Sequence, residues 1–224
     1  MELTPEQVET LFVFTRKKYV HWYDLQAELV DHLASRIEEC CTKDPSLSFE
    51  AALKNVYAGF GLFGFAHIVQ QKQRLLQRSS RRIWWTAFRS FFRWPHLVLI
   101  AALVVLTWQV THNLPAWAAL TLFIAPFLVS EAQLLWLRRK QRRVVRPLLL
   151  LELSPLRFTA GFFYLQLAVN VNGHWSETGL FVLGLVTLLC VLINRASVAG
   201  HQQVQREAET LYPEAFAPAG CITR

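Results

Sequence analysis

Charged residues are scarce in this sequence, and they are unevenly distributed. Asp, Glu, Lys and Arg make up 17% of the 224 residues, whereas hydrophobic residues make up 53%; a soluble domain usually has about a quarter charged residues. Residues 1–71 hold ten acids and six bases, and residues 72–224 hold six acids and 17 bases. Because the bases of the second part lie beside long apolar runs, the pattern favours a membrane protein over a nucleic-acid-binding protein.

Several motifs of catalytic and metal-binding proteins are also missing. The four cysteines show no Cys-x-x-Cys or Cys/His spacing, which argues against a metal site or a disulfide framework. The second part of the chain, where the long apolar runs lie, contains no Gly-x-Ser-x-Gly, no His-Glu-x-x-His and no phosphate-binding glycine loop. We therefore expect neither catalysis nor a cofactor. The acidic start of the chain lacks the basic and apolar regions of a cleaved signal peptide.

Residues 1–76 carry helical patterns throughout. Thr4 and Gln7 have the spacing of a capping box with Pro5 between them, and Asp24 and Ser48 are placed to cap two further helices. Apolar residues then recur at helical spacing, and no strand pattern appears. The sequence predicts a small helical domain with helices at 5–18, at 24–42, from residue 48 onward, and from about residue 65 to 76.

The second predicted helix carries a polar face with two interpretations. Glu28 and His32 lie four residues apart, as in a metal half-site, but Arg36 lies one turn further and its fixed charge disfavours a second cation. The other interpretation, a charge stripe bordering the core, is favoured. We assign partner binding to the exposed side of this helix, namely to Glu28, Asp31, His32 and Glu38.

Three segments of this region resemble a known family. They are YDLQAELVDHLASRIEE at 23–39, SFEAAL at 48–53 and FGLFGFAHIV at 60–69. Together they are similar to the HTH-associated α-helical signalling (HAAS-type) domain over about residues 5–72, with Phe63-Gly64 where the family has a proline. The resemblance implies a bacterial membrane protein with a cytosolic signalling domain, and a PadR-like transcriptional regulator as its partner system.

The remainder of the chain reads as a membrane region. Residues 77–94 combine arginines on one side with Trp84 and Phe88 on another, as in a basic amphipathic helix at a membrane interface. Four apolar runs follow in residues 95–197. The tail at 198–224 begins as a polar helix, loosens at Pro213 and Pro218, and is expected to be solvated. The predicted spans are 95–111, 114–137, 155–171 and 178–193. The third is the weakest, because it contains Arg157 and its apolar length is near the minimum for a span.

The basic residues predict the orientation of these spans. Seven Lys or Arg lie in residues 72–93, directly before the first span, and six lie between the second and third spans, whereas the other two connections contain none. Lys and Arg concentrate on the cytoplasmic side. The distribution therefore places both termini and the middle loop in the cytoplasm of a multi-pass inner-membrane protein.

Two ionisable residues lie inside the predicted spans. Glu131 is near the cytoplasmic end of the second span, and Arg157 is near the same side of the third. Charges at membrane depth mark function or pair with each other. We predict a Glu131–Arg157 ion pair; snorkelling of each side chain to the interface, or a coupling role for Glu131, are the alternatives.

These observations predict an all-α protein with a cytosolic helical domain at 1–76, an interfacial helix at 77–94, a four-span region at 95–197 and a cytosolic tail. The expected function is regulation or interaction without catalysis. Its partners would be the lipid bilayer and a cytosolic protein, without direct nucleic-acid contact, and an oligomer is compatible with this pattern. The alternative is a small transporter or transporter subunit that uses Glu131 and Arg157; a membrane-embedded enzyme comes third.

Overall fold

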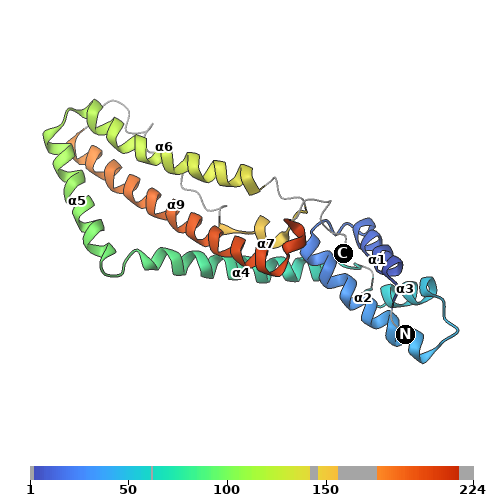
Figure 1. Cartoon of the computed structure of the whole chain (residues 1–224). Helices are drawn as coiled ribbons and strands as arrows, with labels where there is room; N and C mark the ends of the chain where they lie inside the picture. The colour runs from blue at the N-terminus through green and yellow to red at the C-terminus, as the bar shows by residue number, and fades with distance from the viewer. Residues whose placement is uncertain (1–2, 62, 142–145, 156–175, 217–224) are drawn as a thin grey trace. The chain divides into compact units, whose positions relative to one another are not determined.

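The computed structural model describes residues 3–61, 63–141, 146–155 and 176–216 of the chain, and these residues are all-helical. No strand occurs among them, which confirms the predicted all-α class. Figure 1 shows the elements in chain order: α1 (Pro5–Lys17), α2 (Tyr23–Lys43), α3 (Phe49–Ala58), α4 (Ala66–Ser90), α5 (His96–Asn113), α6 (Ala116–Gln141), α7 (Leu149–Glu152), α9 (Glu177–Leu211) and the 3-10 turn η2 (Pro213–Ala215).

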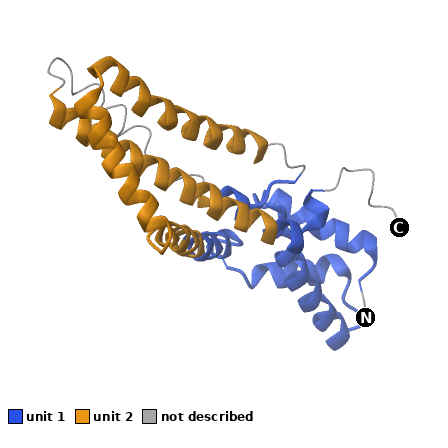
Figure 2. Ribbon diagram, turned by 60° about the vertical axis from the view of Figure 1, so that its left-hand side comes forward, with its two compact units in different colours: residues 1–77, 144–153, 208–224 blue, residues 78–143, 154–207 orange. Residues whose placement is uncertain are grey.

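The chain divides into two compact units. Unit 1 combines residues 1–77 with 144–153 and 208–224, and unit 2 combines 78–143 with 154–207 (Figure 2). Unit 1 is therefore built from three segments that lie far apart in the sequence. The predicted boundary at 76/77 lies one residue from the first boundary between the units, but it falls inside α4, which is one continuous helix.

Unit 1 is built around the apolar face of α2. Leu25, Leu29, Leu33 and Ile37 recur every turn along this helix and are almost completely buried. They pack with buried residues of α1 and α3, so the predicted core stripe is confirmed. Leu149, which comes from the segment after α6, is a member of the same core and is only 1% exposed.

The ends of these helices follow local rules, with one exception. Thr4 and Gln7 form the predicted capping box, and the Ser48 hydroxyl accepts a hydrogen bond from the Ala51 N–H. The exception is Asp24, which was predicted to cap α2. Helix α2 begins one residue earlier, after Trp22, without a side-chain cap. Asp24 therefore lies within the first turn of α2, and its carboxylate accepts hydrogen bonds from a different segment.

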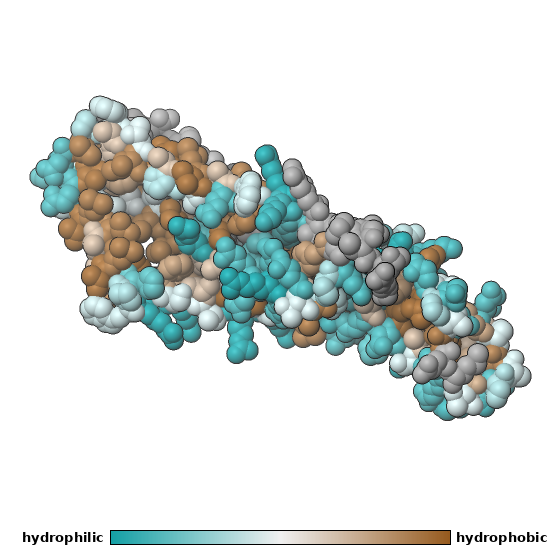
Figure 3. All heavy atoms as spheres, in the orientation of Figure 1, coloured by the Kyte–Doolittle hydropathy of each residue, from teal (hydrophilic) through white to brown (hydrophobic). Residues whose placement is uncertain are grey.

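Unit 2 contains long apolar helices. Three helices of the described residues are long and apolar enough to cross a membrane, namely α5, α6 and α9. Figure 3 shows apolar side chains gathered over α5 and over the adjoining parts of α6 and α9. Many of these side chains are exposed, such as Leu106, Leu128 and Leu189, as expected where lipid rather than protein covers a helix. Apart from Pro155, the predicted span at 155–171 lies outside the described residues.

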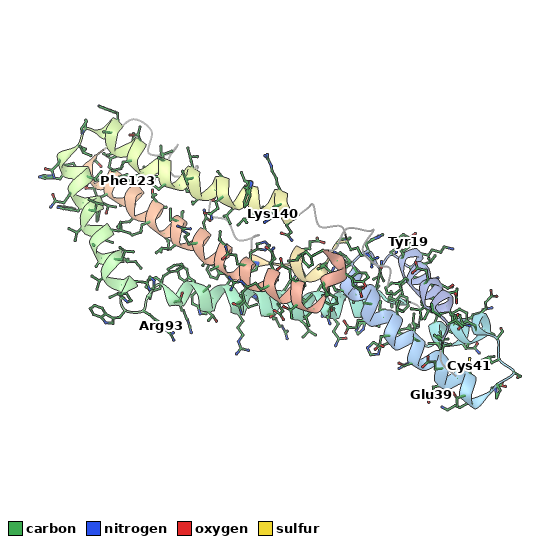
Figure 4. The ribbon with its side chains drawn as sticks, viewed as in Figure 1. Tyr19, Glu39, Cys41, Arg93, Phe123 and Lys140 are labelled. Carbon is green, nitrogen blue, oxygen red and sulfur yellow. The ribbon has the colours of Figure 1, made fainter. Side chains whose placement is uncertain are left out.

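Close packing joins α6 to α9 within unit 2. Phe123 of α6, labelled in Figure 4, is buried against α9 at Gly184. A Cβ at position 184 would lie 2.9 Å from the Phe123 ring, so any larger residue would require the ring to shift. Further along the same pair of helices, Phe127 packs with Leu183 and Cys190. Small residues on α9 thus let a large aromatic side chain fill the interface.

Two helices extend further than the sequence predicted. The residues expected to form a separate interfacial helix continue α4 from Ala66 to Ser90, and the Trp84 indole donates a hydrogen bond to Ser197 of α9, 3.1 Å away. The predicted aromatic face therefore contacts protein at Trp84. Helix α9 likewise continues to Leu211, and Ala208 and Ala215 are fully buried. The polar helix expected at the start of the tail is present, but the expectation that the tail is solvated does not hold for the buried Ala208 and Ala215.

Candidate functional site

The predicted partner-binding face of α2 divides into engaged and exposed residues. The Glu28 carboxylate forms an ion pair with Lys72 of α4 at 2.6 Å, and the Glu38 carboxylate accepts a hydrogen bond from the Leu3 N–H at 3.0 Å. Asp31 and His32 are exposed, and the structure gives them no ion pair or hydrogen bond among the described residues. Only Asp31 and His32 are therefore available to a partner without breaking an internal contact.

No metal site forms at this face. Arg36 lies over the Phe60 ring with its guanidinium carbon 5.9 Å from the ring centre, and Glu28 is neutralised by Lys72. Among the described residues, no group of three or more His, Cys, Asp or Glu side chains is placed to hold a metal ion. The charge-stripe interpretation fits this geometry, since each of Glu28 and Arg36 has a structural contact.

A second set of contacts joins the three segments of unit 1, and Asp24 lies at its centre. The Asp24 side chain is 6% exposed, and its two carboxylate oxygens accept hydrogen bonds from the Leu149 and Leu150 N–H groups, each at 3.0 Å. These are the first N–H groups of the short helix α7, which have no partner inside their own helix. Asp24 thus supplies a cap to a segment 125 residues further along the chain.

Tyr23 connects the same two segments to the third one. Its N–H donates to the Pro147 carbonyl at 2.8 Å, and its hydroxyl donates to the Glu214 carboxylate near η2. Arg146 lies over its ring, 4.6 Å from the ring centre. Burial raises the pKa of the Tyr23 hydroxyl, and the hydrogen bond to Glu214 raises it further. We call this group of Tyr23, Asp24, residues 146–150 and Glu214 the three-segment joint.

The joint has a cavity beside it. The cavity has a volume of about 560 Å³ and is partly open, and both acidic and basic side chains line it, including Glu9, Arg16 and Arg146. The charges nearly balance, so the lining favours neither an anion nor a cation. The cavity therefore does not indicate the charge of a ligand. The hydrogen bonds of the joint hold the three segments of unit 1 together.

In unit 2, four buried polar residues and one buried cysteine follow one face of α9. Thr187, Cys190, Asn194, Ser197 and His201 recur at intervals of three and four residues, and all five are at least 96% buried. Their partners come from several elements: Ser197 accepts from Trp84 of α4, and His201 Nδ1 lies 3.1 Å from Ser154 Oγ. Burying polar side chains in a membrane-spanning bundle costs free energy unless they are paired. This stripe of α9 is therefore a candidate functional feature.

Glu131 belongs to this stripe through Asn194. The Asn194 amide nitrogen donates to Glu131 Oε1 at 2.9 Å and to Ser130 Oγ at 3.0 Å. The predicted partner of Glu131, Arg157, lies outside the described residues, so the Glu131–Arg157 pair stays a prediction. Among the described residues, Glu131 contacts the side-chain amide of Asn194 on α9.

Sequence reasoning found Glu131 but missed Asn194, Ser197 and His201. A charged residue in an apolar run stands out by itself, whereas an asparagine at the end of such a run resembles an ordinary boundary residue. The available signal was the spacing of 187, 190, 194, 197 and 201, which places all five residues on one helical face.

By its fold, then, the chain is a helical protein with three described helices able to cross a membrane and a separate compact helical unit. No protein-family model, curated protein or solved structure matches it.

Proposed function

We propose that the chain is a multi-pass membrane protein of the cytoplasmic membrane whose unit 1 is a cytosolic regulatory or adaptor domain, with no catalytic activity of its own. The observation that carries the proposal is the three-segment joint. It makes one compact unit from the N-terminal helices, the segment after α6 and the segment after α9. Two of these segments directly follow α6 and α9 in the chain. A change in the position of these helices can therefore alter the structure of unit 1.

The composition of unit 1 also supports a four-span topology. A compact unit lies on one side of a membrane, so residues 1–77, 144–153 and 208–216 share that side. Helices α5 and α6 form one outward and one return crossing between the first two segments. Helix α9 supplies one crossing between the second and third segments. Two segments on the same side of the membrane must be joined by an even number of crossings. The proposal places the remaining crossing at 155–171, outside the described residues apart from Pro155.

The basic residues support the side on which unit 1 lies. Arg78, Arg81 and Arg82 precede α5, and Arg138, Arg139 and Lys140 end α6. The connections at the other ends of these helices contain no Lys or Arg. Because Lys and Arg accumulate in cytoplasmic segments, both termini and unit 1 are assigned to the cytoplasm.

We assign partner binding to the Asp31–His32 side of α2, and a PadR-like regulator to the partner, as the resemblance to the HAAS-type domain implies. An exposed acid and imidazole on a helix face can form charge-assisted hydrogen bonds with a basic surface. Glu28 and Glu38 contribute indirectly, since their internal contacts hold the helix in place.

Binding of a purified PadR-like regulator tests the assignment. With the full-length protein in lipid nanodiscs, Asp31→Lys should weaken binding at least about tenfold, the effect of placing one like charge in a charged interface. Glu50→Lys, at an exposed acid on α3, is the matched control and should leave binding unchanged. Absence of binding by the unmodified protein, or equal losses in both variants, would contradict the assignment.

A small transporter or transporter subunit is the second candidate function. The polar stripe of α9 favours it, because buried polar residues inside a bundle line ion and substrate pathways in many membrane proteins. Copurification with an ATPase, and no binding to the regulator, is the result that separates this candidate from the first.

A further inference from the structure

Ser130, Glu131 and Asn194 form a polar cluster that contains more acceptors than donors. Both hydrogens of the Asn194 amide are used, on Ser130 Oγ and on Glu131 Oε1. The Ser130 hydroxyl hydrogen is used on the Phe127 carbonyl at 2.8 Å. The remaining oxygen of the amide, Asn194 Oδ1, is buried and has no hydrogen-bond partner among the described residues. The cluster thus has an unsatisfied acceptor beside a carboxylate.

An unsatisfied acceptor beside a carboxylate is unfavourable in the surroundings of this cluster. Asn194 is 1% exposed and Glu131 is partly buried, and the buried apolar residues within about one turn of them on α6 and α9 include Phe127, Leu134 and Val198. A carbonyl oxygen and a carboxylate in such surroundings are destabilising unless something positive or a hydrogen-bond donor reaches them. No donor of the three residues themselves is left for this purpose.

We propose that this cluster binds a small monovalent cation of the sodium type. Its ligand set is all oxygen: a carboxylate, an amide carbonyl and a hydroxyl, which are hard ligands suited to hard cations. The cluster has a single acidic residue, so a single positive charge neutralises it. Divalent ions usually take several carboxylates, and the described residues contain no group of three or more His, Cys, Asp or Glu side chains for one.

The amide of Asn194 explains how the empty site is held together. Its nitrogen occupies the point that lies 2.9 Å from Glu131 Oε1 and 3.0 Å from Ser130 Oγ. A half-turn of the amide exchanges its nitrogen and oxygen, which are similar in size and shape. The exchanged oxygen would then face the other two oxygens, and a cation between the three would replace the amide hydrogens. This inference concerns the occupant of the cluster and holds for either proposed function.

Thermal unfolding of the full-length protein in detergent tests the site. The probes are NaCl, KCl and choline chloride, compared at equal ionic strength and pH. A ligand that binds only the folded state raises the midpoint in a saturable way. We expect Na⁺ to raise Tm by at least about 3 °C relative to choline. Glu131→Gln and Asn194→Leu should each remove this difference.

Two control variants separate a specific site from a general salt effect. Glu177→Gln changes an exposed acid of the same helix α9 and should keep the Na⁺ response. Arg157→Gln tests whether the Arg157 guanidinium, the predicted partner of Glu131, occupies the cluster in place of the cation. This variant should also keep the Na⁺ response. No Na⁺-specific shift in the unmodified protein, or a shift that persists in Glu131→Gln, would overturn the proposal. Saturable ²²Na⁺ binding to the unmodified protein is the second readout, so the test does not depend on how well a variant folds; no binding would also overturn it.

Discussion

At the scale of single residues, Tyr19 has a backbone conformation that suits another amino acid better. It follows α1 with φ +65° and is 82% exposed, while the Tyr19 and Val20 N–H groups bond back to Arg16 and Thr15. This is the pattern in which glycine commonly ends a helix. A side chain in this left-handed conformation costs about 1 kcal/mol. Figure 4 labels this residue.

We therefore predict that Tyr19→Gly stabilises the protein. The expected gain is about 1 kcal/mol, or roughly 2–4 °C in Tm for a chain of this size. Thermal unfolding by circular dichroism measures it. Lys18→Gly is the control, since Lys18 has φ −93° and no such strain to relieve; it should be neutral or destabilising. A Tyr19→Gly protein no more stable than Tyr19→Ala would show that the strain is absent.

Asp24 is the residue on which the joint depends most. Removal of its carboxylate leaves the Leu149 and Leu150 N–H groups without their acceptor. The expected cost of Asp24→Ala is about 2–4 kcal/mol, because each buried unsatisfied group costs roughly 1–3 kcal/mol. Asp31→Ala, an exposed acid of the same helix, should change the stability by less than about 0.5 kcal/mol. Equal stability of both variants would mean that Asp24 does not hold the segment after α6.

At the scale of elements, the sequence predicts what depends on local pattern. The capping box at Thr4, the cap at Ser48 and the stripe of Leu25, Leu29, Leu33 and Ile37 are all present, since each is determined by residues within a few positions. Asp24 was misassigned because a good N-cap residue can equally cap another segment. That choice depends on tertiary contacts, which no local spacing records.

The same limit applies to the candidate sites. Glu131 was identifiable as a charge in an apolar run, but its contact with Asn194 depends on how α6 and α9 pack. The sequence indicated a polar helix at the start of the tail, but its burial was missed because its polar residues were taken as solvated, whereas Val204 and Ala208 are buried. The exposed pair Asp31 and His32 could not be separated from Glu28 and Glu38 before their partners, Lys72 and the Leu3 N–H, were placed.

Packing between α6 and α9 leads to an element-scale prediction for Gly184. Alanine normally stabilises a helix relative to glycine by about 0.5–1 kcal/mol. Here its Cβ would lie 2.9 Å from the ring of Phe123, which is buried and has little room to move. Gly184→Ala should therefore lower the stability by about 1–2 kcal/mol net, and adding Phe123→Leu should restore part of it. A simple gain in Tm for Gly184→Ala would contradict the close approach.

At the scale of the whole molecule, one compact unit is assembled from segments separated by helices that are long and apolar enough to cross a membrane. The core of unit 1 comes from the N-terminal helices and from Leu149 of the segment after α6. The segment after α9 contributes the buried residue Ala215 to the same unit. This assembly requires all three segments to lie on one side of the membrane. The proposed topology, the cytoplasmic regulatory unit and the coupling through the joint all depend on that requirement.

Labelling of single cysteines in whole cells tests it most directly. In a cysteine-free background, Asn113→Cys and Ser176→Cys should react with a membrane-impermeant thiol reagent, because they lie at the lysine- and arginine-free ends of α5 and α9. Gln141→Cys, at the end of α6 that leads to the joint, should react only after the cells are opened. Reaction of position 141 in intact cells, with positions 113 and 176 protected, would contradict the account.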